Sequence, residues 1–187
     1  MSQIGIFFGT DTGTTRLMGK KMAKLLGDDI AAKPLNINRA SIDDLLSYPA
    51  LILGTATYGE GRLPGLETNV RNGSWLEFLP QLEGADFSGK VVALYGLGNQ
   101  VKYGERYADG MFELYQLFKG MGATIIGDWS TEGYTYQQSK AVVDGRFVGL
   151  ALDHKTQGLL TEGRMRDWIA QIKPALVAAV EAQAEPA

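Results

Sequence analysis

The segment Ile4-Gly5-Ile6-Phe7-Phe8 runs directly into the polar loop Gly9-Thr10-Asp11-Thr12-Gly13-Thr14-Thr15. A short, continuous apolar run of this kind is typical of a strand buried on both faces of a sheet. Further apolar residues then recur at helical spacing until Gly27, namely Leu17, Met18, Met22, Leu25 and Leu26. We therefore expect a strand, a loop and a helix, which together form the first unit of an α/β sheet.

Similar units follow along the chain. Apolar runs ending in glycine occupy Ala50–Gly54, Val91–Gly96 and Thr124–Gly127, and Ile30–Ile37 is a weaker run that Pro34 assigns to a sheet edge. Residues 128–146 are polar, and a strand pattern resumes at Phe147–Leu152.

Helices are expected after Ser41 and Ser74, around Met111 to Phe118, and from near Thr161 onward, the last one strained or broken at Pro174. The pattern predicts an α/β fold with a doubly wound parallel sheet of five strands. Its last strand is interrupted by an insertion, and a single domain covers residues 1–187.

Composition excludes several kinds of chemistry. The chain has 187 residues, no Cys, one His and a formal charge of −3, from 18 Lys and Arg against 21 Asp and Glu. Thiolate nucleophiles, Fe–S clusters and His-rich metal sites are therefore excluded, and the lone His154 is not expected to be catalytic. We expect no catalytic residues and no metal. Nucleic-acid binding is not expected, because no Lys/Arg-rich run is present.

No apolar run approaches the roughly 18 residues that a membrane span requires. The chain also begins without a pattern typical of a signal peptide. We expect a cytoplasmic monomer with no membrane segment.

The loop after the first strand has the composition of an oxyanion site. Backbone N–H groups and the dipole at a helix N-terminus favour negative charge, and threonine hydroxyls add donors. A polar turn that binds nothing is the competing interpretation. The loop lacks the spacing and the lysine of a P-loop, so nucleoside triphosphate hydrolysis is not expected.

Two later loops each place a tyrosine among glycines. They are Thr55-Ala56-Thr57-Tyr58-Gly59-Glu60-Gly61 and Gly96-Leu97-Gly98-Asn99-Gln100-Val101-Lys102-Tyr103. In an α/β sheet these loops share one crevice with the threonine loop, so the tyrosines are placed to flank a flat ring whose phosphate binds at Thr10–Thr15. The sequence predicts a site for a planar phosphorylated heterocycle.

With these loops the chain resembles the flavodoxins from Ile4 to Ile172. Trp129-Ser130-Thr131-Glu132-Gly133-Tyr134 resembles the extra loop of the long-chain subgroup. Leu63-Pro64-Gly65-Leu66 through Trp75-Leu76-Glu77-Phe78-Leu79 resembles the lengthened loop of flavodoxins that serve nitrogenase in nitrogen-fixing bacteria.

The resemblance implies strand order 2-1-3-4-5 and a noncovalent FMN that carries single electrons at low potential between semiquinone and hydroquinone. The protein would then be an electron carrier, not an enzyme. Implied partners are the nitrogenase iron protein, a flavodoxin reductase or a pyruvate:flavodoxin oxidoreductase. The implied FMN contacts are Thr10, Asp11, Thr12, Gly13, Thr14 and Thr15 at the phosphate, and Thr57, Tyr58, Gly59, Leu97, Gly98, Asn99 and Tyr103 around the ring.

Two departures from the family pattern concern charge. Asn99 stands where many relatives have aspartate, and Lys102 where glycine is common, so both make the local field less negative. FMN-dependent quinone or NAD(P)H reductases share the fold and remain an alternative. A phosphoacceptor receiver module is excluded, because an acidic pair after the first strand and an Asp after the third are missing.

Overall fold

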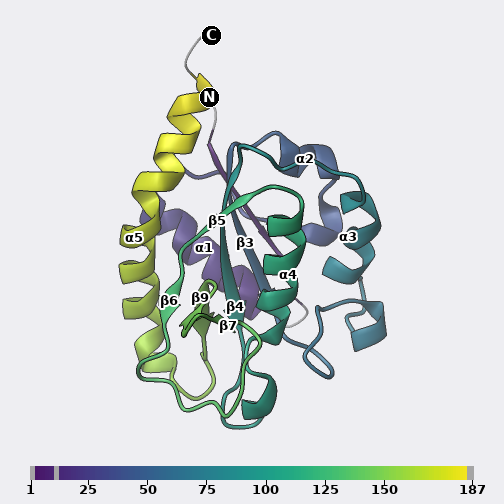
Figure 1. Cartoon of the computed structure of the whole chain (residues 1–187), viewed down its shortest axis with the longest axis vertical. Coiled ribbons are helices and arrows are strands. Elements are labelled where there is room, and N and C mark those ends of the chain that lie inside the picture. Colours follow the sequence, from purple (N-terminus) through teal and green to yellow (C-terminus); the bar gives the residue numbers. More distant parts are fainter. Residues whose placement is uncertain (1–2, 11–12, 185–187) are drawn as a thin grey trace.

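A computed structural model describes residues 3–10 and 13–184 of the chain. A parallel sheet with the order β2-β1-β3-β4-β5 lies at its centre (Figure 1), which confirms the expected fold class. The strands of this sheet are β1 (Ile4–Phe8), β2 (Leu35–Asn36), β3 (Ala50–Ala56), β4 (Val91–Leu97), β5 (Thr124–Ile126) and β9 (Leu150–Leu152). The two-residue strand β2 lies at the edge, as Pro34 indicated.

The fifth strand is split in two, as the insertion predicted. The first half, β5, pairs with β4 from Val91 to Ala93, and β9 pairs with the same strand from Tyr95 to Leu97. Between the halves, a small antiparallel sheet is formed by β6 (Trp129–Ser130), β7 (Val142–Val143) and β8 (Arg146–Phe147).

The expected single strand Phe147–Leu152 is wrong. Phe147 belongs to β8, and the chain then turns at Val148 and Gly149 before β9 begins. A Cβ on Gly149 would overlap the carbonyl of Leu94, so only glycine lets the chain enter the sheet this closely.

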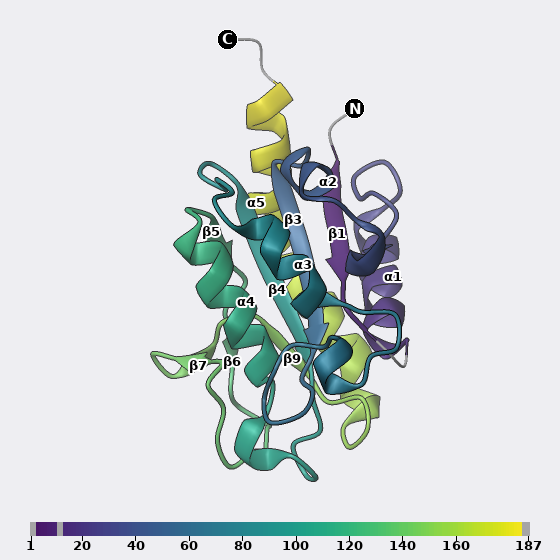
Figure 2. The same ribbon diagram turned by 90° about the vertical axis from the view of Figure 1, so that its right-hand side faces the viewer.

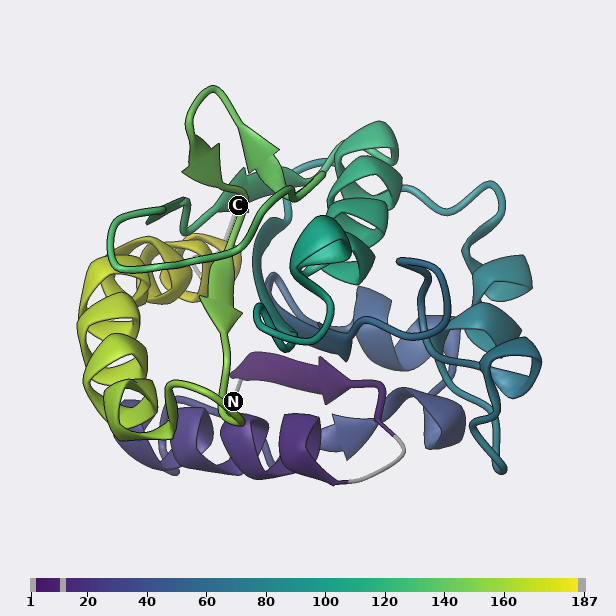
Figure 3. The same cartoon turned by 90° about the horizontal axis from the view of Figure 1, so that it is seen from below.

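Helices cover both faces of the sheet (Figures 2 and 3). They are α1 (Thr14–Leu26), α2 (Ile42–Leu46), α3 (Trp75–Leu82), α4 (Asp109–Gly120) and α5 (Gly158–Ala184), with short 3₁₀ turns at Ile37–Arg39, Leu66–Thr68 and Gly104–Arg106. Strand side chains alternate between the faces: Ile6 and Ile52 pack with α1 and α5, and Phe7 packs with α2, α3 and α4. Among residues 3–10 and 13–184, no helix is both long and apolar enough to span a membrane.

Three details of the helices differ from expectation. Leu17 and Leu25 are 44% and 43% exposed, so the buried stripe of α1 is narrower than the leucine spacing indicated. The last helix begins at Gly158 and continues through Pro174 without a break. Proline removes one backbone hydrogen bond, and burial of Ile172 and Leu176 on either side holds the helix together there.

Gly54 in β3 is the point of closest packing beneath the loops. Its carbonyl accepts hydrogen bonds from the Gly9 N–H at 3.0 Å and from Trp75 Nε1 at 2.9 Å. The ring of Tyr95 crosses over it, and a Cβ on Gly54 would overlap the Tyr95 ring atoms Cζ and Cε1. The Tyr95 hydroxyl then donates to the Thr15 carbonyl at 2.8 Å. Strands β1, β3 and β4 and helices α1 and α3 are thereby fastened at one place.

We expect Gly54→Ala to destabilise the fold by about 3 kcal/mol, because Tyr95 has no space to move within a fully packed core. Urea unfolding of the purified protein measures this change. A matched control is Gly120→Ala, since a Cβ there meets nothing within 4 Å. A loss below about 1 kcal/mol at Gly54 would contradict the packing argument.

Candidate functional site

Four loops meet at the carboxyl edge of the sheet, where parallel strands place their outgoing segments together. They follow β1, β3, β4 and β9, and Figure 3 views the molecule from this end. The sequence predicted three of them as site loops.

A cavity of about 290 Å³ lies between the loops after β3 and β4. Its lining residues are Thr57, Tyr58, Gly59, Gly61, Gly98, Asn99, Tyr103, Arg106 and Tyr107. Six of the residues expected around a flat ring are thus brought together. The seventh, Leu97, ends β4 with its side chain buried in the core against α1 and α5.

The tyrosines of the cavity differ in exposure. Tyr103 is 55% exposed, and Lys102 Nζ lies 5.3 Å from its ring centroid. Tyr107 is buried, and its hydroxyl has no hydrogen-bond partner among the described residues. Its ring stacks on Tyr136, with centroids 5.7 Å apart and an angle of 17° between the planes. One aromatic wall is therefore solvent-facing and the other is fixed.

Sequence reasoning missed Tyr107 and Arg106. Both follow the predicted loop at the 3₁₀ turn Gly104–Arg106, which folds the chain back to the cavity before α4 begins. Nothing in their spacing separates them from ordinary loop or core residues.

The loop after β1 forms a turn with unused donors. Thr10 Oγ1 accepts the Gly13 N–H at 3.1 Å, and Gly13 adopts a left-handed conformation with φ +88° before α1 begins. Thr14 opens the helix, and Thr15 is 1% exposed with a hydroxyl that has no partner among the described residues. The expected contacts Asp11 and Thr12 lie outside the described residues. Because buried hydroxyls are normally hydrogen-bonded, Thr15 offers a donor for a ligand.

The first turn of α4 fastens the segment Thr57–Leu63, which we call the glycine-tipped loop. Thr57 Oγ1 accepts the Gly110 N–H at 3.0 Å, and the Leu63 N–H donates to Glu113 at 3.3 Å. Backbone hydrogen bonds in both directions between Tyr58 and Arg62, each 2.8 Å, close the loop.

The tip of this loop has a backbone conformation that favours glycine. Gly59 and Gly61 have φ +54° and +80°, a left-handed region that favours glycine. The ends of the loop are thus held while its tip keeps conformations that other residues disfavour.

The loop after β4 is held by polar side chains. Asn99 Oδ1 accepts the N–H groups of Val101 at 3.1 Å and Lys102 at 2.9 Å. Asp153, 1% exposed, accepts the N–H of Gln100 at 3.0 Å and of Thr156 at 2.9 Å. One buried carboxylate therefore joins this loop to the start of α5.

The insertion packs behind the same loop. Backbone N–H groups of Gln137 and Gln138 both donate to the Gly104 carbonyl at 2.8 Å, and the Lys140 N–H donates to Asp109 at 2.8 Å. Tyr134 is half-buried beside Tyr107 and Phe147, and its desolvation there raises the pKa of Tyr134 to about 12. The insertion therefore packs against the outer side of the cavity wall and stabilises it through these contacts.

The one charged side chain in the cavity lining is basic. Arg106 lines the cavity, and no Asp or Glu does. Glu60 and Glu105 lie close in sequence to the lining residues Gly59 and Arg106, and both are exposed to solvent. Glu67 forms an exposed ion pair with Arg62, in which the charged atoms are 3.0 Å apart. The acidic excess between Leu63 and Asp153 is thus not concentrated on the cavity wall.

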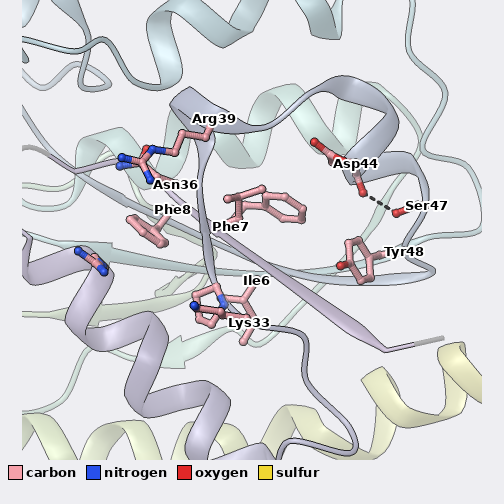
Figure 4. Close-up of a pocket in the computed structure, with 12 residues that line it drawn as sticks. Ile6, Phe7, Phe8, Lys33, Asn36, Arg39, Asp44, Ser47 and Tyr48 are labelled. Atoms are coloured by element: carbon pink, nitrogen blue, oxygen red, sulfur yellow. Dashed lines mark hydrogen bonds between the residues drawn. The ribbon is translucent and has the colours of Figure 1, made fainter. Parts of the chain in front are cut away.

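A second cavity, of about 480 Å³, lies at the β2 edge (Figure 4). Phe7 and Phe8 contribute to its wall, with Tyr48 packed edge-on against Phe7 at 5.8 Å, and Arg39 and Lys33 lie at its rim. None of the expected site residues lines it. We therefore place the functional site at the first cavity.

The single histidine lies beside the start of α5. His154 Nδ1 lies 3.4 Å from Thr161 Oγ1, in a position set by the start of α5. Within the described part of the chain, no three His, Asp or Glu side chains are grouped to hold a metal ion.

Comparison with known proteins gives one consistent match. The flavodoxin family model matches residues 6–168. A flavodoxin of Klebsiella pneumoniae is 47% identical over 92% of this chain and 98% of the relative, and Flavodoxin 1 of Escherichia coli K12 is 40% identical over 94% and 96%. The crystal structure of Fusobacterium nucleatum flavodoxin bound to flavin mononucleotide has a TM-score of 0.83 and 36% identity, and covers 94% of this chain and 99% of that one.

We expect Asp153→Ala to lower the free energy of unfolding by about 3 kcal/mol, because two N–H groups lose a charged acceptor. Urea unfolding tests this, with Asp167→Ala on the exposed side of α5 as control. If both variants unfold at the same urea concentration, Asp153 does not hold the loop.

Proposed function

Because the chain belongs to the flavodoxin family, we propose that it is an FMN-binding electron carrier whose whole length, residues 1–187, serves as one domain in the cytoplasm. It is an electron-transfer protein and not an enzyme. FMN supplies one-electron chemistry at low potential, between its semiquinone and hydroquinone forms. The observation that carries this proposal is the pairing of an aromatic cavity with a neighbouring loop in which the buried Thr15 hydroxyl has no partner among the described residues.

The threonine loop holds the phosphate in this proposal. Backbone N–H groups at the start of α1 and the hydroxyls of Thr10, Thr14 and Thr15 donate to it. Asp11, Thr12 and Gly13 of the same loop are further contacts in this proposal, with the backbone N–H of Asp11 and not its carboxylate as the donor. The buried, unpartnered hydroxyl of Thr15 supports this assignment. No Lys or Arg is required, because the helix dipole already favours a dianion there.

The loops after β3 and β4 hold the ring. Tyr103 stacks on the outer face, and Thr57 and Tyr58 lie on the inner side. Gly98, Asn99 and the backbone at Leu97 follow the ring edge. The half-exposed position of Tyr103 supports this arrangement, since a ring beneath it remains close enough to solvent for a partner protein to approach.

Gly59 contributes by its backbone. Its peptide turns its carbonyl toward the flavin and stabilises the one-electron state, which glycine allows at small steric cost. The fixed ends of the glycine-tipped loop support this role, because the rearrangement is then confined to the tip.

The direct test is to purify the protein and record its spectrum. We expect a yellow protein with one FMN per chain and no FAD, and a semiquinone during dithionite titration. A colourless protein that takes up no FMN would rule out the proposal. Steady-state NAD(P)H oxidation with a quinone acceptor would instead favour the reductase alternative.

Thr15→Val should weaken FMN binding by about tenfold and leave riboflavin binding unchanged, because the variant keeps the shape and loses a donor to a charged group. Fluorescence titration of the FMN-free protein measures both constants. Thr124→Val, at the amino end of the sheet, is the control. An equal loss for both ligands would place the phosphate elsewhere.

For the partner we propose the nitrogenase iron protein, with a flavodoxin reductase or a pyruvate:flavodoxin oxidoreductase as donor, and a monomeric carrier. The lengthened segment Leu63–Leu79 supports this choice. It is well anchored, since the Leu76 N–H donates to the Pro64 carbonyl at 3.1 Å and the Leu66 N–H donates to Glu77 at 3.2 Å. Leu66 is left 59% exposed, as suits a contact surface.

Electron transfer to the iron protein should slow as salt rises, because exposed charges steer the encounter. Charge reversal at Glu60 or Glu105 should reduce the bimolecular rate, while reversal at Glu67 should act less, since Arg62 already neutralises it. Glu181→Lys, on the distant end of α5, is the control. Stopped-flow oxidation across ionic strength gives the rates. Salt-independent rates would remove this account of docking.

A further inference from the structure

Asp109 is a buried carboxylate between two parts of the site. It is the first residue of α4 and is 5% exposed. One oxygen, Oδ1, accepts the Lys140 N–H of the insertion at 2.8 Å. The other, Oδ2, lies against Gly61, where a Cβ would come within 2.9 Å of it. The side chain therefore touches the insertion with one oxygen and the glycine-tipped loop with the other.

This placement has an electrostatic cost. Burial raises the pKa of Asp109 above its ordinary value, while the hydrogen bond from the Lys140 backbone and the charges of Lys140 and Arg106 oppose the shift. A helix N-terminus favours an acid in its first turn, but it does so equally well for an exposed one. The helix dipole therefore does not explain why this acid is buried against Gly61.

The rest of the first turn of α4 makes the same connection. Gly110 binds Thr57 at the beginning of the glycine-tipped loop, and Glu113 binds Leu63 at its end. Asp109 meets the loop between them, at the tip. Helix α4 thus contacts the loop at three points, and at the tip the contact residue, Asp109, also binds the insertion.

We propose that Asp109 is a positioning residue, which ties the insertion to Gly61 and limits the conformations open to the Gly59–Gly61 tip. The consequence for FMN rests on the proposed function, whereas the link between Asp109 and the loop does not. Two features favour glycine at position 61: its positive φ, and the Asp109 carboxylate, which leaves no space for a side chain.

Amide hydrogen exchange on the protein as purified tests the link. The N–H groups of Tyr58 and Arg62 report on the loop, because they bond to each other's carbonyls. We expect their exchange to accelerate by about tenfold in Asp109→Ala. Asp109→Asn keeps one oxygen for Lys140 and loses the charge at Gly61, so its effect should be smaller but measurable. Asp167→Asn is the matched control and should have none.

The second measurement is the ratio of the dissociation constants for oxidised and reduced FMN. In Asp109→Asn we expect this ratio to move about tenfold in favour of reduced FMN, because a negative charge beside the cavity is removed. For the two-electron couple of oxidised and reduced FMN, a tenfold change corresponds to about 29.6 mV. A residue that only stabilises the fold would not move this ratio.

Two outcomes would overturn the proposal. Wild-type exchange rates in both Asp109 variants would leave Asp109 as a helix-terminal acid only. Faster exchange in Asp109→Ala, with the same FMN ratio as in Asp109→Asn, would show that the position of the tip does not matter to the cofactor, since both variants lose the charge. Failure of the wild-type protein to bind FMN would instead count against the proposed function, and the exchange measurement would still decide the link.

Discussion

Close packing at Gly54 is the constraint on which the rest of the structure depends. Its missing side chain gives Tyr95 room to cross β3 and reach the Thr15 carbonyl, and its own carbonyl holds Gly9 and Trp75. Helices α1 and α3 lie on opposite faces of the sheet, yet both begin at this point. The threonine loop therefore starts from a fixed position.

The insertion fixes the other side of the site, behind the cavity. It gives backbone hydrogen bonds to Gly104 and Asp109 and packs Tyr136 against Tyr107. The wall behind the cavity is thus held firmly, while the side chain of Tyr103 on the open side is 55% exposed.

The chain itself carries no redox group, since it lacks cysteine. Its contribution is to bind a cofactor and to set the field around it. Arg106 lines the cavity and Lys102 lies over Tyr103, while Asp109 is buried at its back. Charges of both signs therefore act on the same small volume, and single neutral substitutions there are expected to change the stability of reduced FMN more than they change the fold.

The sequence by itself determined the sheet, the split fifth strand and the three site loops, because apolar runs ending in glycine and helical spacing are local patterns that survive folding. Composition likewise excluded cysteine and histidine chemistry. Local patterns gave the wrong prediction where tertiary packing determines which residues are buried. Leu17 and Leu25 fit the helical stripe but face solvent. Pro174 lies inside a helix because packing of residues on both sides compensates for the lost hydrogen bond.

Only the tertiary structure revealed Arg106 and Tyr107 as cavity residues, Asp153 as the link to α5, and Asp109 as the contact between the insertion and Gly61. These roles join residues separated by 31 to 53 positions. No repeat or spacing in the chain encodes such pairs, since they arise from the way parallel strands bring distant loops to one edge.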